Sequence, residues 1–251
     1  ALVGLADDLQ RLDALAAAVK ADLCEIYPDV DGVYSTDPRI VRNARKLPAI
    51  SYDEMLELAH LGAAVLHPRA VEYAKLYSVP LVVRSSFTEH EGTLVKGEAA
   101  LEQGIVVSGI ACDKNVARIS IQGVPDRPGI LAKVFTALGN AGVDVDIIVQ
   151  GAVDGGKADV SFTVSGNDLD KALSVIETVR KDVEYEGVSS ETGLAKVSIV
   201  GAGMVSNPGV AARMFEVIAG QGVNIKMVST SEIKVSCVIE SESMKQVVIA
   251  L

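Results

Sequence analysis

The spacing of hydrophobic positions along the first hundred residues predicts short helices that alternate with strands. Hydrophobic residues recur at near-helical intervals through residues 1–20. A short apolar run, Leu23–Ile26, predicts a buried strand that leads into a loop rich in Asp, Gly and Pro. Further helices are expected over 51–62, which opens with a serine N-cap and two acids, and over 70–76, followed by a strand over 81–84. This alternation is typical of an α/β sheet, which binds ligands at the carboxyl ends of its strands.

From about residue 105 the pattern changes to β-branched strands alternating with amphipathic helices, and this second pattern occurs twice. Each copy has the order strand, helix, strand, strand, helix, and a closing strand remains to be assigned. The corresponding segments of the two copies are 118–124 and 196–201, 128–141 and 208–220, 143–150 and 223–229, 158–164 and 234–240, and 168–179 and 243–251.

Both copies open their first helix with Pro-Gly, at Pro128-Gly129 and at Pro208-Gly209. Pro is preorganised for the first turn, Gly lets a ligand approach the backbone, and the N–H groups of the helix N-terminus attract an anion such as an α-carboxylate. Acids and amides nearby could receive the ammonium group of an amino acid. The residues so placed, which include one serine hydroxyl, are Asp126, Asp144, Asp146 and Gln150 in the first copy, and Asn207, Asn224, Ser231 and Glu232 in the second. The alternative is that these residues are ordinary caps and strand ends, although their recurrence in both copies favours a ligand.

Composition excludes several classes of protein. The chain has 251 residues, 49% hydrophobic and 22% charged, which predicts a globular protein with more than one core. Its formal charge of −10 opposes nucleic-acid binding, and no apolar run reaches the roughly 18 residues that span a bilayer. Residues 1–12 lack the pattern of a secretory leader, and the three cysteines are too far apart in sequence for a disulfide framework. We therefore expect reduced thiols and a cytoplasmic protein that binds neither nucleic acid nor membrane.

The loop from Asp29 to Arg39 is the first candidate for chemistry. Its carboxylates could bind Mg²⁺ or a ribose, the ring of Tyr34 could stack on a base, and the guanidinium of Arg39 could bind phosphate. A surface turn rich in Asp, Gly and Pro explains the same composition, so on the residues alone both interpretations stay open.

The remaining motifs give weaker evidence for a functional site. The histidines are scattered without ligand spacing, so no metal site is expected. Neither Cys24 nor Cys112 has neighbours that would make it a nucleophile. Gly201-Ala202-Gly203 begins like a dinucleotide-binding loop, but Ser206 stands where the third glycine belongs, so we reject that interpretation.

Several segments form an ordered set of motifs: Glu25–Tyr34 with Asp37-Pro38-Arg39, Glu54–Ala59, Gly62–Glu72, Val83–Ser86 and Ser229–Ile233. These motifs closely resemble aspartokinase, and the similarity extends over essentially residues 13–251. The repeated segments resemble the paired ACT modules of that family.

This resemblance implies an α/β kinase-lobe fragment like that of the amino-acid kinases, joined to an α+β region of two ferredoxin-like βαββαβ ACT domains. The implied domains are the kinase fragment at 1–96, the first ACT domain at 114–190, and the second made from 101–113 together with 191–251. In this arrangement Ile105–Ala111 completes the sheet of the second module.

The resemblance also implies an activity: phosphorylation of the β-carboxylate of L-aspartate to 4-phospho-L-aspartate, with MgATP as substrate and no tightly bound cofactor. The reaction leads to lysine, threonine and methionine, and lysine and/or threonine would be the effector. The implied nucleotide contacts are Pro28, Asp29, Tyr34 and Arg39, with Ala64 and Val65 on the adenine side. The family commonly has Thr where Pro28 stands and sometimes Lys where Ala64 stands, which leaves single hydrogen bonds in doubt.

The implied effector contacts lie on both repeats. They are Asp126, Arg127, Pro128, Gly129, Ile130, Leu131, Asp144, Val145, Asp146 and Gln150 in one, and Ser206, Asn207, Pro208, Gly209, Val210, Ala211, Asn224, Ile225, Ser231 and Glu232 in the other. Because ACT modules expose sheet edges, we expect a homo-oligomer or an α/β hetero-oligomer that pairs through them.

The sequence departs from the family at its start. The Lys-(Phe/Tyr)-Gly-Gly-(Thr/Ser) segment that supplies the phosphate-facing lysine is absent, so the catalytic lysine and the aspartate-binding residues are not assigned. Residues 1–12 resemble an early helix of the kinase lobe, which predicts a missing stretch near 12–13. Two hypotheses remain: an aspartate kinase whose sequence is incomplete, or a non-catalytic, amino-acid-sensing regulatory subunit. The kinase-like segment 23–95 favours the enzyme.

Overall fold

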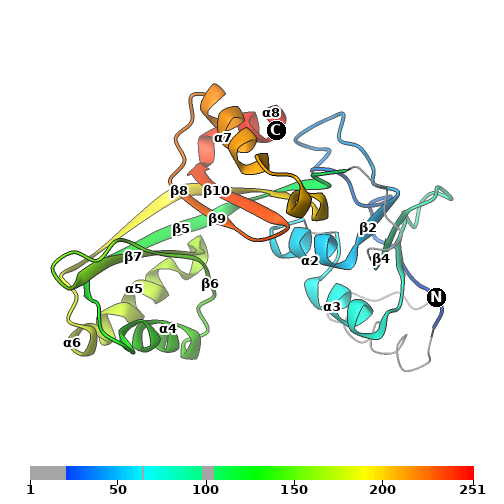
Figure 1. Ribbon diagram of the computed structural model, residues 1–251. Coiled ribbons are helices and arrows are strands. Elements are labelled where there is room, and N and C mark those ends of the chain that lie inside the picture. The colour runs from blue at the N-terminus through cyan, green and yellow to red at the C-terminus, as the bar shows by residue number, and fades with distance from the viewer. Residues whose placement is uncertain (1–20, 64, 98–104) are drawn as a thin grey trace.

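The computed structural model describes residues 21–63, 65–97 and 105–251, which form two β-sheets with helices packed against them (Figure 1). The smaller sheet has the strand order β1-β3-β4-β2, in which only β3 and β4 are antiparallel neighbours. The elements of this N-terminal lobe are β1 (Cys24–Ile26), β2 (Ala49–Ser51), α2 (Tyr52–His60), α3 (Pro68–Tyr77), β3 (Leu81–Val83) and β4 (Thr93–Lys96). The helix expected within residues 1–20 lies outside the described residues.

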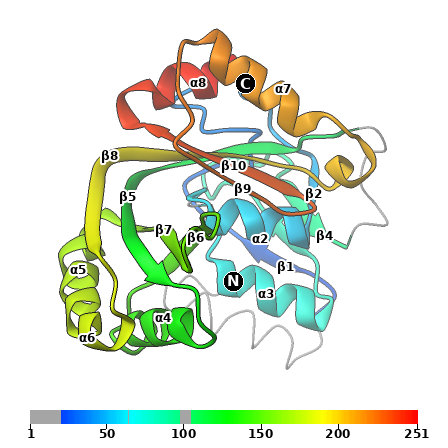
Figure 2. The same ribbon diagram turned by 60° about the vertical axis from the view of Figure 1, so that its left-hand side comes forward.

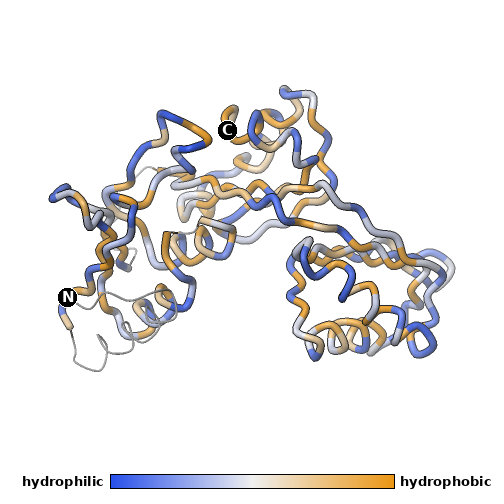
Figure 3. The backbone as a smooth tube through the Cα atoms, turned by 180° about the vertical axis from the view of Figure 1, so that it is seen from behind, coloured by the Kyte–Doolittle hydropathy of each residue, from blue (hydrophilic) through white to orange (hydrophobic). Residues whose placement is uncertain are grey.

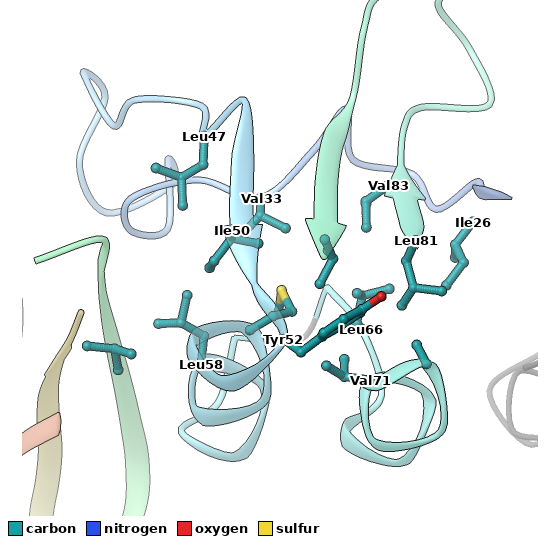
Figure 4. Packing of buried hydrophobic residues seen from close by; sticks show 14 of the residues in the cluster. Ile26, Val33, Leu47, Ile50, Tyr52, Leu58, Leu66, Val71, Leu81 and Val83 are labelled. Atoms are coloured by element: carbon teal, nitrogen blue, oxygen red, sulfur yellow. The ribbon is translucent and has the colours of Figure 1, made fainter. Parts of the chain in front are cut away.

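The two helices of the lobe close its hydrophobic core against the sheet (Figure 4). Met55 and Leu58 of α2, Val71 of α3, and Leu81 and Val83 of β3 are each at most 2% exposed. Burial of such side chains contributes roughly 1.5–3 kcal/mol each, so the apolar faces of the helices determine how they dock on the sheet.

Both helices begin where local chemistry satisfies their free N–H groups. At α2 the Ser51 hydroxyl accepts from the Glu54 N–H (3.2 Å), and the Glu54 carboxylate accepts from the Ser51 N–H (3.2 Å), a capping box. At α3, Pro68 occupies the first turn and the Nδ1 atom of His67 accepts from the N–H of Arg69 (3.2 Å).

The larger sheet has six strands in the order β6-β7-β5-β8-β10-β9. Its strands are β5 (Gly109–Pro125), β6 (Val145–Gln150), β7 (Lys157–Ser165), β8 (Gly187–Val200), β9 (Met227–Thr230) and β10 (Lys234–Glu240). The two long strands β5 and β8 are antiparallel and lie in the middle, so each contributes to both halves of the sheet (Figure 1).

Helices cover each half of the large sheet and divide it into two modules. The first module has α4 (Ile130–Asn140), η2 (Gly166–Asp168), α5 (Leu169–Thr178) and α6 (Arg180–Val183), and the second has η3 (Ala202–Ser206), α7 (Val210–Gly220), η4 (Ser241–Ser243) and α8 (Met244–Ala250). Each module has its own buried cluster. In Figure 3 hydrophobic stretches gather along these helices and strands, whereas the outlying loops are largely hydrophilic.

The two modules exchange their closing strands. The N-terminal part of β8 pairs with the C-terminal part of β5 and closes the first module, as in the pair Ile121 and Val188. Conversely, the start of β5 pairs with the end of β8, as in the pair Gly109 and Val200, beside β10 of the second module. We expected residues 105–108 to be part of this closing strand, but they precede it, since β5 begins at Gly109. The Ser108 N–H still donates to the Val200 carbonyl (2.8 Å).

The second module packs against the N-terminal lobe. The Ile110 N–H donates to the Ser35 carbonyl (2.7 Å), and Lys234 forms an ion pair with Glu57 (2.9 Å). Ala111 and Val200 belong to the lobe's buried cluster, so the lobe and the second module share a hydrophobic boundary. The first module lies away from the lobe (Figure 1), and β5 and β8 run from it to the second module (Figure 2).

The structure adds or shortens strands where the sequence patterns were weak. β2 and β4 were not expected, because each is three or four residues long and neighbours a polar turn. In the second module β9 begins at Met227 rather than at Val223. Within 21–63, 65–97 and 105–251, no helix combines the length and the apolar character needed to cross a bilayer.

Candidate functional site

The expected nucleotide loop follows β1 at an edge of the small sheet. Because β1 and β3 are parallel, the loops after them emerge side by side, and the Ser86 N–H donates to the Pro28 carbonyl (3.4 Å). Asp29 is exposed and Pro28 is half-buried at this edge. The loop after β3, including the ion pair of Arg84 with Glu25 (3.1 Å), therefore belongs to the same region.

A chain of polar contacts holds the middle of the loop. The Tyr34 hydroxyl donates to Asp31 Oδ1 (2.9 Å), and Lys46 lies 3.5 Å from the other oxygen of Asp31. Lys46 also donates to the Glu91 carbonyl (2.9 Å). Burial alone would raise the pKa of Asp31, but the hydrogen bond from Tyr34 and the charge of Lys46 outweigh it and lower the pKa. The hydroxyl of the half-buried Tyr34 is thereby fixed beside Asp31.

Arg39 carries the cation expected to bind phosphate. Its Nε and NH2 atoms donate to Asp37 at 3.0 and 2.8 Å, and this pairing lowers the pKa of Asp37. The Arg39 side chain is 89% exposed. Because an exposed ion pair contributes little, typically below about 1 kcal/mol, Arg39 can exchange Asp37 for a phosphate oxygen at small cost.

Sequence reasoning missed the residues that fix this loop from a distance. The buried hydroxyl of Thr93 accepts from the Val33 N–H (2.8 Å) and donates to the Leu47 carbonyl (2.6 Å). A side chain at Gly32, whose φ is +151°, would meet that hydroxyl at 2.7 Å. The glycine was visible in the sequence, but its partner lies sixty residues away and no local pattern indicates it. Val65 packs half-buried against the lobe core, and Ala64 lies outside the described residues.

The expected effector loops share an unusual helix start in both modules. Gly129 and Gly209 are the N-cap residues of α4 and α7, with left-handed φ of 88° and 93°, and neither helix has a side-chain cap. Nothing lies within 4 Å of where a side chain would begin at either glycine. The free N–H groups of the first helical turn are thus available to an anion in both modules.

Neighbouring turns lie at the same end of the sheet as these helix starts. In the second module the turn Ser231-Glu232 is adjacent, since the Gly201 N–H donates to the Ile233 carbonyl (2.9 Å). In the first module Gln150 ends β6 on the corresponding side, while Arg127 is turned toward Glu184 (2.8 Å). Asn207 donates back to the Gly203 carbonyl (2.7 Å), which closes the loop before α7. The remaining loop residues are Asp126, Pro128, Ile130 and Leu131, and Ser206, Pro208, Val210 and Ala211.

The structure does not bring Asp144, Val145 and Asp146 to the helix start of their own module. Val145 pairs with Val164, which pairs with Ala117, and Pro125 is eight residues farther along β5. At about 3.3 Å per residue the two groups are roughly 25 Å apart along the strands. Asp146 instead pairs with Lys196 of β8. In the second module Asn224 and Ile225 precede β9, likewise at the end opposite to Ser231.

Other reactive groups offer no additional centre. Among residues 21–63, 65–97 and 105–251, no three His, Cys, Asp or Glu side chains are grouped to hold a metal ion. Burial raises the pKa of the Cys237 thiol to about 12, so it stays protonated at neutral pH.

Three segments of the chain match models of known protein families. Residues 13–85 match the model of the amino acid kinase family, and residues 117–181 and 197–251 each match a model of the ACT domain. The fold is thus an amino-acid-kinase fragment followed by two ACT domains of ferredoxin-like type.

The chain also resembles characterised proteins over most of its length. An aspartokinase of Bacillus sp. (strain MGA3) is 54% identical over 238 residues, which are 95% of this chain and 58% of that protein. Aspartokinase III of E. coli, solved with aspartate and ADP in the R-state, is 29% identical with a TM-score of 0.83, covering 99% of this chain and 55% of that one. The same enzyme with lysine and aspartate in the T-state gives 28% and 0.76, covering 98% and 55%.

A third relative corresponds to the ACT region. The regulatory subunit of aspartate kinase from Thermus thermophilus is 40% identical with a TM-score of 0.55, covering 58% of this chain and 96% of that subunit. The chain spans less than two thirds of the length of the curated relatives it matches. Together, the kinase-like lobe, the two ACT domains and these similarities show that the chain belongs to the aspartokinase family.

Proposed function

We propose that this chain supplies the nucleotide-side part of the catalytic lobe and the regulatory region of an aspartate kinase, which transfers a phosphoryl group from MgATP to the β-carboxylate of L-aspartate. The observation that carries the proposal is the 54% identity to an aspartokinase across 95% of the chain. The E. coli relative was solved with aspartate and ADP, the acceptor and the spent donor of that reaction.

The arrangement of the loop after β1 suits a nucleotide. Tyr34 is held by Asp31 with its ring available for stacking, and the exposed Asp29 can bind ribose or the magnesium ion of MgATP. Arg39 can turn from Asp37 to a phosphate oxygen. Pro28 would also contact the nucleotide, and Ala64 and Val65 would lie on the adenine side. Phosphoryl transfer depends mainly on positioning and on electrostatic stabilisation, and this loop would position the donor.

We further propose that lysine and/or threonine binds at the uncapped helix starts of the ACT domains and inhibits the kinase. Each helix start offers backbone N–H groups to the effector carboxylate. Because Asp144–Asp146 lies about 25 Å along the strands from the helix start of its own module, a ligand that touches both groups requires a second chain. The effector pocket would then be completed in an oligomer that pairs through its ACT domains.

An alternative function is a non-catalytic regulatory subunit. It is favoured by the match that covers 96% of the regulatory subunit from Thermus thermophilus. The lobe at residues 21–97, with its own buried core and its nucleotide-type loop, favours the kinase instead.

Three measurements test these functions. Intact mass decides whether the polypeptide is well above 26.3 kDa, as the kinase requires, or equal to it, as the subunit alternative requires. Aspartate-dependent ATP consumption by the full-length protein then tests catalysis, and its absence would contradict the kinase. Calorimetry with lysine and threonine, singly and together, tests sensing; no measurable heat at millimolar concentration would remove the sensor role.

Site variants sharpen the nucleotide assignment. Asp29→Ala and Arg39→Ala should each raise the KM for MgATP roughly tenfold or more, because a charge-assisted hydrogen bond contributes about 1.5–3 kcal/mol. The heat of effector binding should stay unchanged, since the two sites are separate. An unchanged KM in both variants would remove these residues from the site.

A further inference from the structure

Glu54 is a buried carboxylate at the boundary between the lobe and the second ACT domain. It is only 3% exposed although it lies in the first turn of α2. One oxygen accepts from the Ser51 hydroxyl (2.7 Å) and from the Ser51 N–H (3.2 Å). The other accepts from the Ser108 hydroxyl (2.5 Å) and from the Ala202 N–H (2.9 Å). A single carboxylate therefore joins three segments that are far apart in the sequence.

The hydrogen bonds keep this buried group charged. Burial by itself would raise the pKa of Glu54, but the donors on Ser108, Ala202 and Ser51 outweigh it and lower the pKa. A capping box alone would need only the Ser51 contacts. The two further donors, from the connector before β5 and from the start of η3, show that the carboxylate also fastens the second ACT domain to α2.

The contacts of Glu54 with Ser108 and Ala202, which we call the joint, also explain the Gly201-Ala202-Gly203 motif. A side chain at Gly201 would lie 2.1 Å from the Val106 carbonyl oxygen, and one at Gly203 would lie 2.5 Å from that of Ile105. Both approaches are far too close for a Cβ atom, so the glycines let the connector 105–108 cross over η3. This motif, which does not fit a dinucleotide loop, instead brings the Ala202 N–H to Glu54.

The joint lies between the two proposed binding regions. η3 leads directly into the loop 206–211, an expected effector contact, and Val65, on the expected adenine side, follows α2 and packs against the same core as that helix. Resting on the function proposed above, we propose that Glu54 is the positioning residue that couples the effector loop of the second ACT domain to the nucleotide side of the kinase lobe. An effector that shifts η3 changes the bond between Ala202 and Glu54, and α2 responds because its cap is part of the same group.

Apart from the backbone bond between Ile110 and Ser35, the boundary also has a side-chain ion pair between Lys234 and Glu57, which is weaker than the Glu54 contacts. Lys234 and Glu57 keep 21% and 26% of their side-chain surfaces in solvent, where an ion pair is screened. Glu54 is almost fully buried, and hydrogen bonds to a buried charge are stronger and more sensitive to geometry. The coupling therefore depends mainly on Glu54.

Hydrogen exchange on the full chain without ligand tests the joint directly. In Glu54→Gln the amides of 202–207 and of the first turn of α2 should exchange about tenfold faster, because the charge-assisted bonds are lost. Ser108→Ala, which leaves the bond from Ala202, should give a smaller increase at 202–207. Asp53→Asn is the matched control: it neutralises the neighbouring acid of α2, which pairs with Lys75 inside the lobe, and should leave 202–207 unchanged.

Two outcomes would overturn the proposal. Exchange at 202–207 that stays at the wild-type rate in Glu54→Gln would show that the bond from Ala202 carries no coupling. An equal increase throughout β10 and α8 would show that Glu54 only stabilises the fold. Ser108→Ala keeps the test decisive if Glu54→Gln fails to fold, since its effect must be confined to the joint.

A second arm measures the response to lysine and threonine. Wild-type protein should bind an effector and lose kinase activity, whereas Glu54→Gln should bind it within about threefold of the wild-type Kd while the maximal inhibition falls by at least half. Full inhibition of Glu54→Gln would refute the coupling role. If the wild type itself shows neither binding nor inhibition, the proposed function fails, while the ligand-free exchange still decides whether the joint exists.

Discussion

The two ACT domains of this chain share a backbone framework but differ in their core side chains and in the charges at their boundary. Ser120 and Ser161 form a hydroxyl pair at 2.8 Å in the first, and Ser198 and Ser236 form the same pair at 2.7 Å in the second. Both domains also begin a helix on an uncapped left-handed glycine. The residues that determine the backbone path are thus repeated.

The cores differ at equivalent positions. Phe162 of β7 is fully buried in the first domain and packs edge-on against Phe135, with ring centroids 5.4 Å apart. The second domain has the smaller Cys237 at the corresponding position of β10, where it contacts the sulfur of Met214 at 4.0 Å. The long, flexible side chain of Met214, which is 2% exposed, thus packs against the smaller Cys237.

Charges differ even more at the seam between the domains, which is closed by Val116, Ile147, Leu194, Met227 and Val238. In the first domain Asp146 of β6 pairs with Lys196. The residue at the equivalent position of the second domain is Lys226, which pairs with Glu191 (3.0 Å) and Glu240 (2.8 Å). Arg118 joins the same group through Glu191 (2.6 Å). The repeat keeps the fold and inverts the charge, so the two domains are not expected to bind one effector equally.

Substitutions in the two cores should show the largest difference in stability between the domains. Phe162→Ala should lower the free energy of unfolding by about 3–5 kcal/mol, because it removes a large side chain and leaves a cavity. Cys237→Ala removes only a sulfur atom and should cost about 1 kcal/mol. Urea denaturation of both variants measures the difference, and equal losses would contradict the unequal packing of the two cores.

Breaking the seam should have an intermediate effect. Lys196→Met removes a cation whose side chain is only 10% exposed and leaves Asp146 without its partner, which should cost about 1–3 kcal/mol. Lys226→Met should cost less, since the Lys226 side chain is 28% exposed and its charge is better screened by solvent. Thermal unfolding compares the two variants, and a larger loss for Lys226→Met would reverse our ranking of the two seam contacts.

Acid should weaken the side of the molecule where the second domain meets the lobe. The pKa of Glu54 is lower in the folded chain than in the unfolded chain, so unfolding takes up a proton below the ordinary carboxyl range. The stability from Glu54 is therefore present above the unfolded pKa and declines as the pH falls through the folded pKa. Glu54→Gln should flatten this decline in unfolding free energy measured from pH 7 downward, whereas Asp53→Asn should leave it intact. An unchanged slope in Glu54→Gln would contradict the assignment.

The smallest effect is expected in chemical labelling of the Cys237 thiol. With a pKa of about 12 and no exposure, its thiol should not react with iodoacetamide at pH 8 in the folded chain. Mass mapping after labelling checks this, with the urea-unfolded chain as the control in which Cys237 is modified. Labelling of folded Cys237 at the rate of the unfolded chain would show that the core of the second domain opens readily.

Much of the architecture followed from local pattern. The alternation of strands and helices predicted β1, α2, α3 and β3 within a few residues, and the repeated Pro-Gly starts predicted α4 and α7. These elements have an apolar period, a cap or a turn residue close in sequence, which is the information a single sequence contains. The short strands β2 and β4 lack such a period and form because neighbouring strands supply their hydrogen bonds.

The features of the candidate sites can likewise be divided into those that local sequence predicts and those that depend on distant contacts. The sequence by itself determined that Asp29 to Arg39 forms a loop and that α4 and α7 start on glycine, because loop composition and backbone freedom are properties of adjacent residues. Only the tertiary structure decided that Asp146 pairs with Lys196, that Thr93 fixes the loop at Gly32, and that Glu54 joins Ser108 and Ala202. Those partners lie 50 to 148 residues apart. Asp146 meets Lys196, and Glu54 meets Ser108 and Ala202, because β5 and β8 cross both halves of the large sheet and carry distant segments to one place. Thr93 meets the loop because β4 lies in the small sheet beside it.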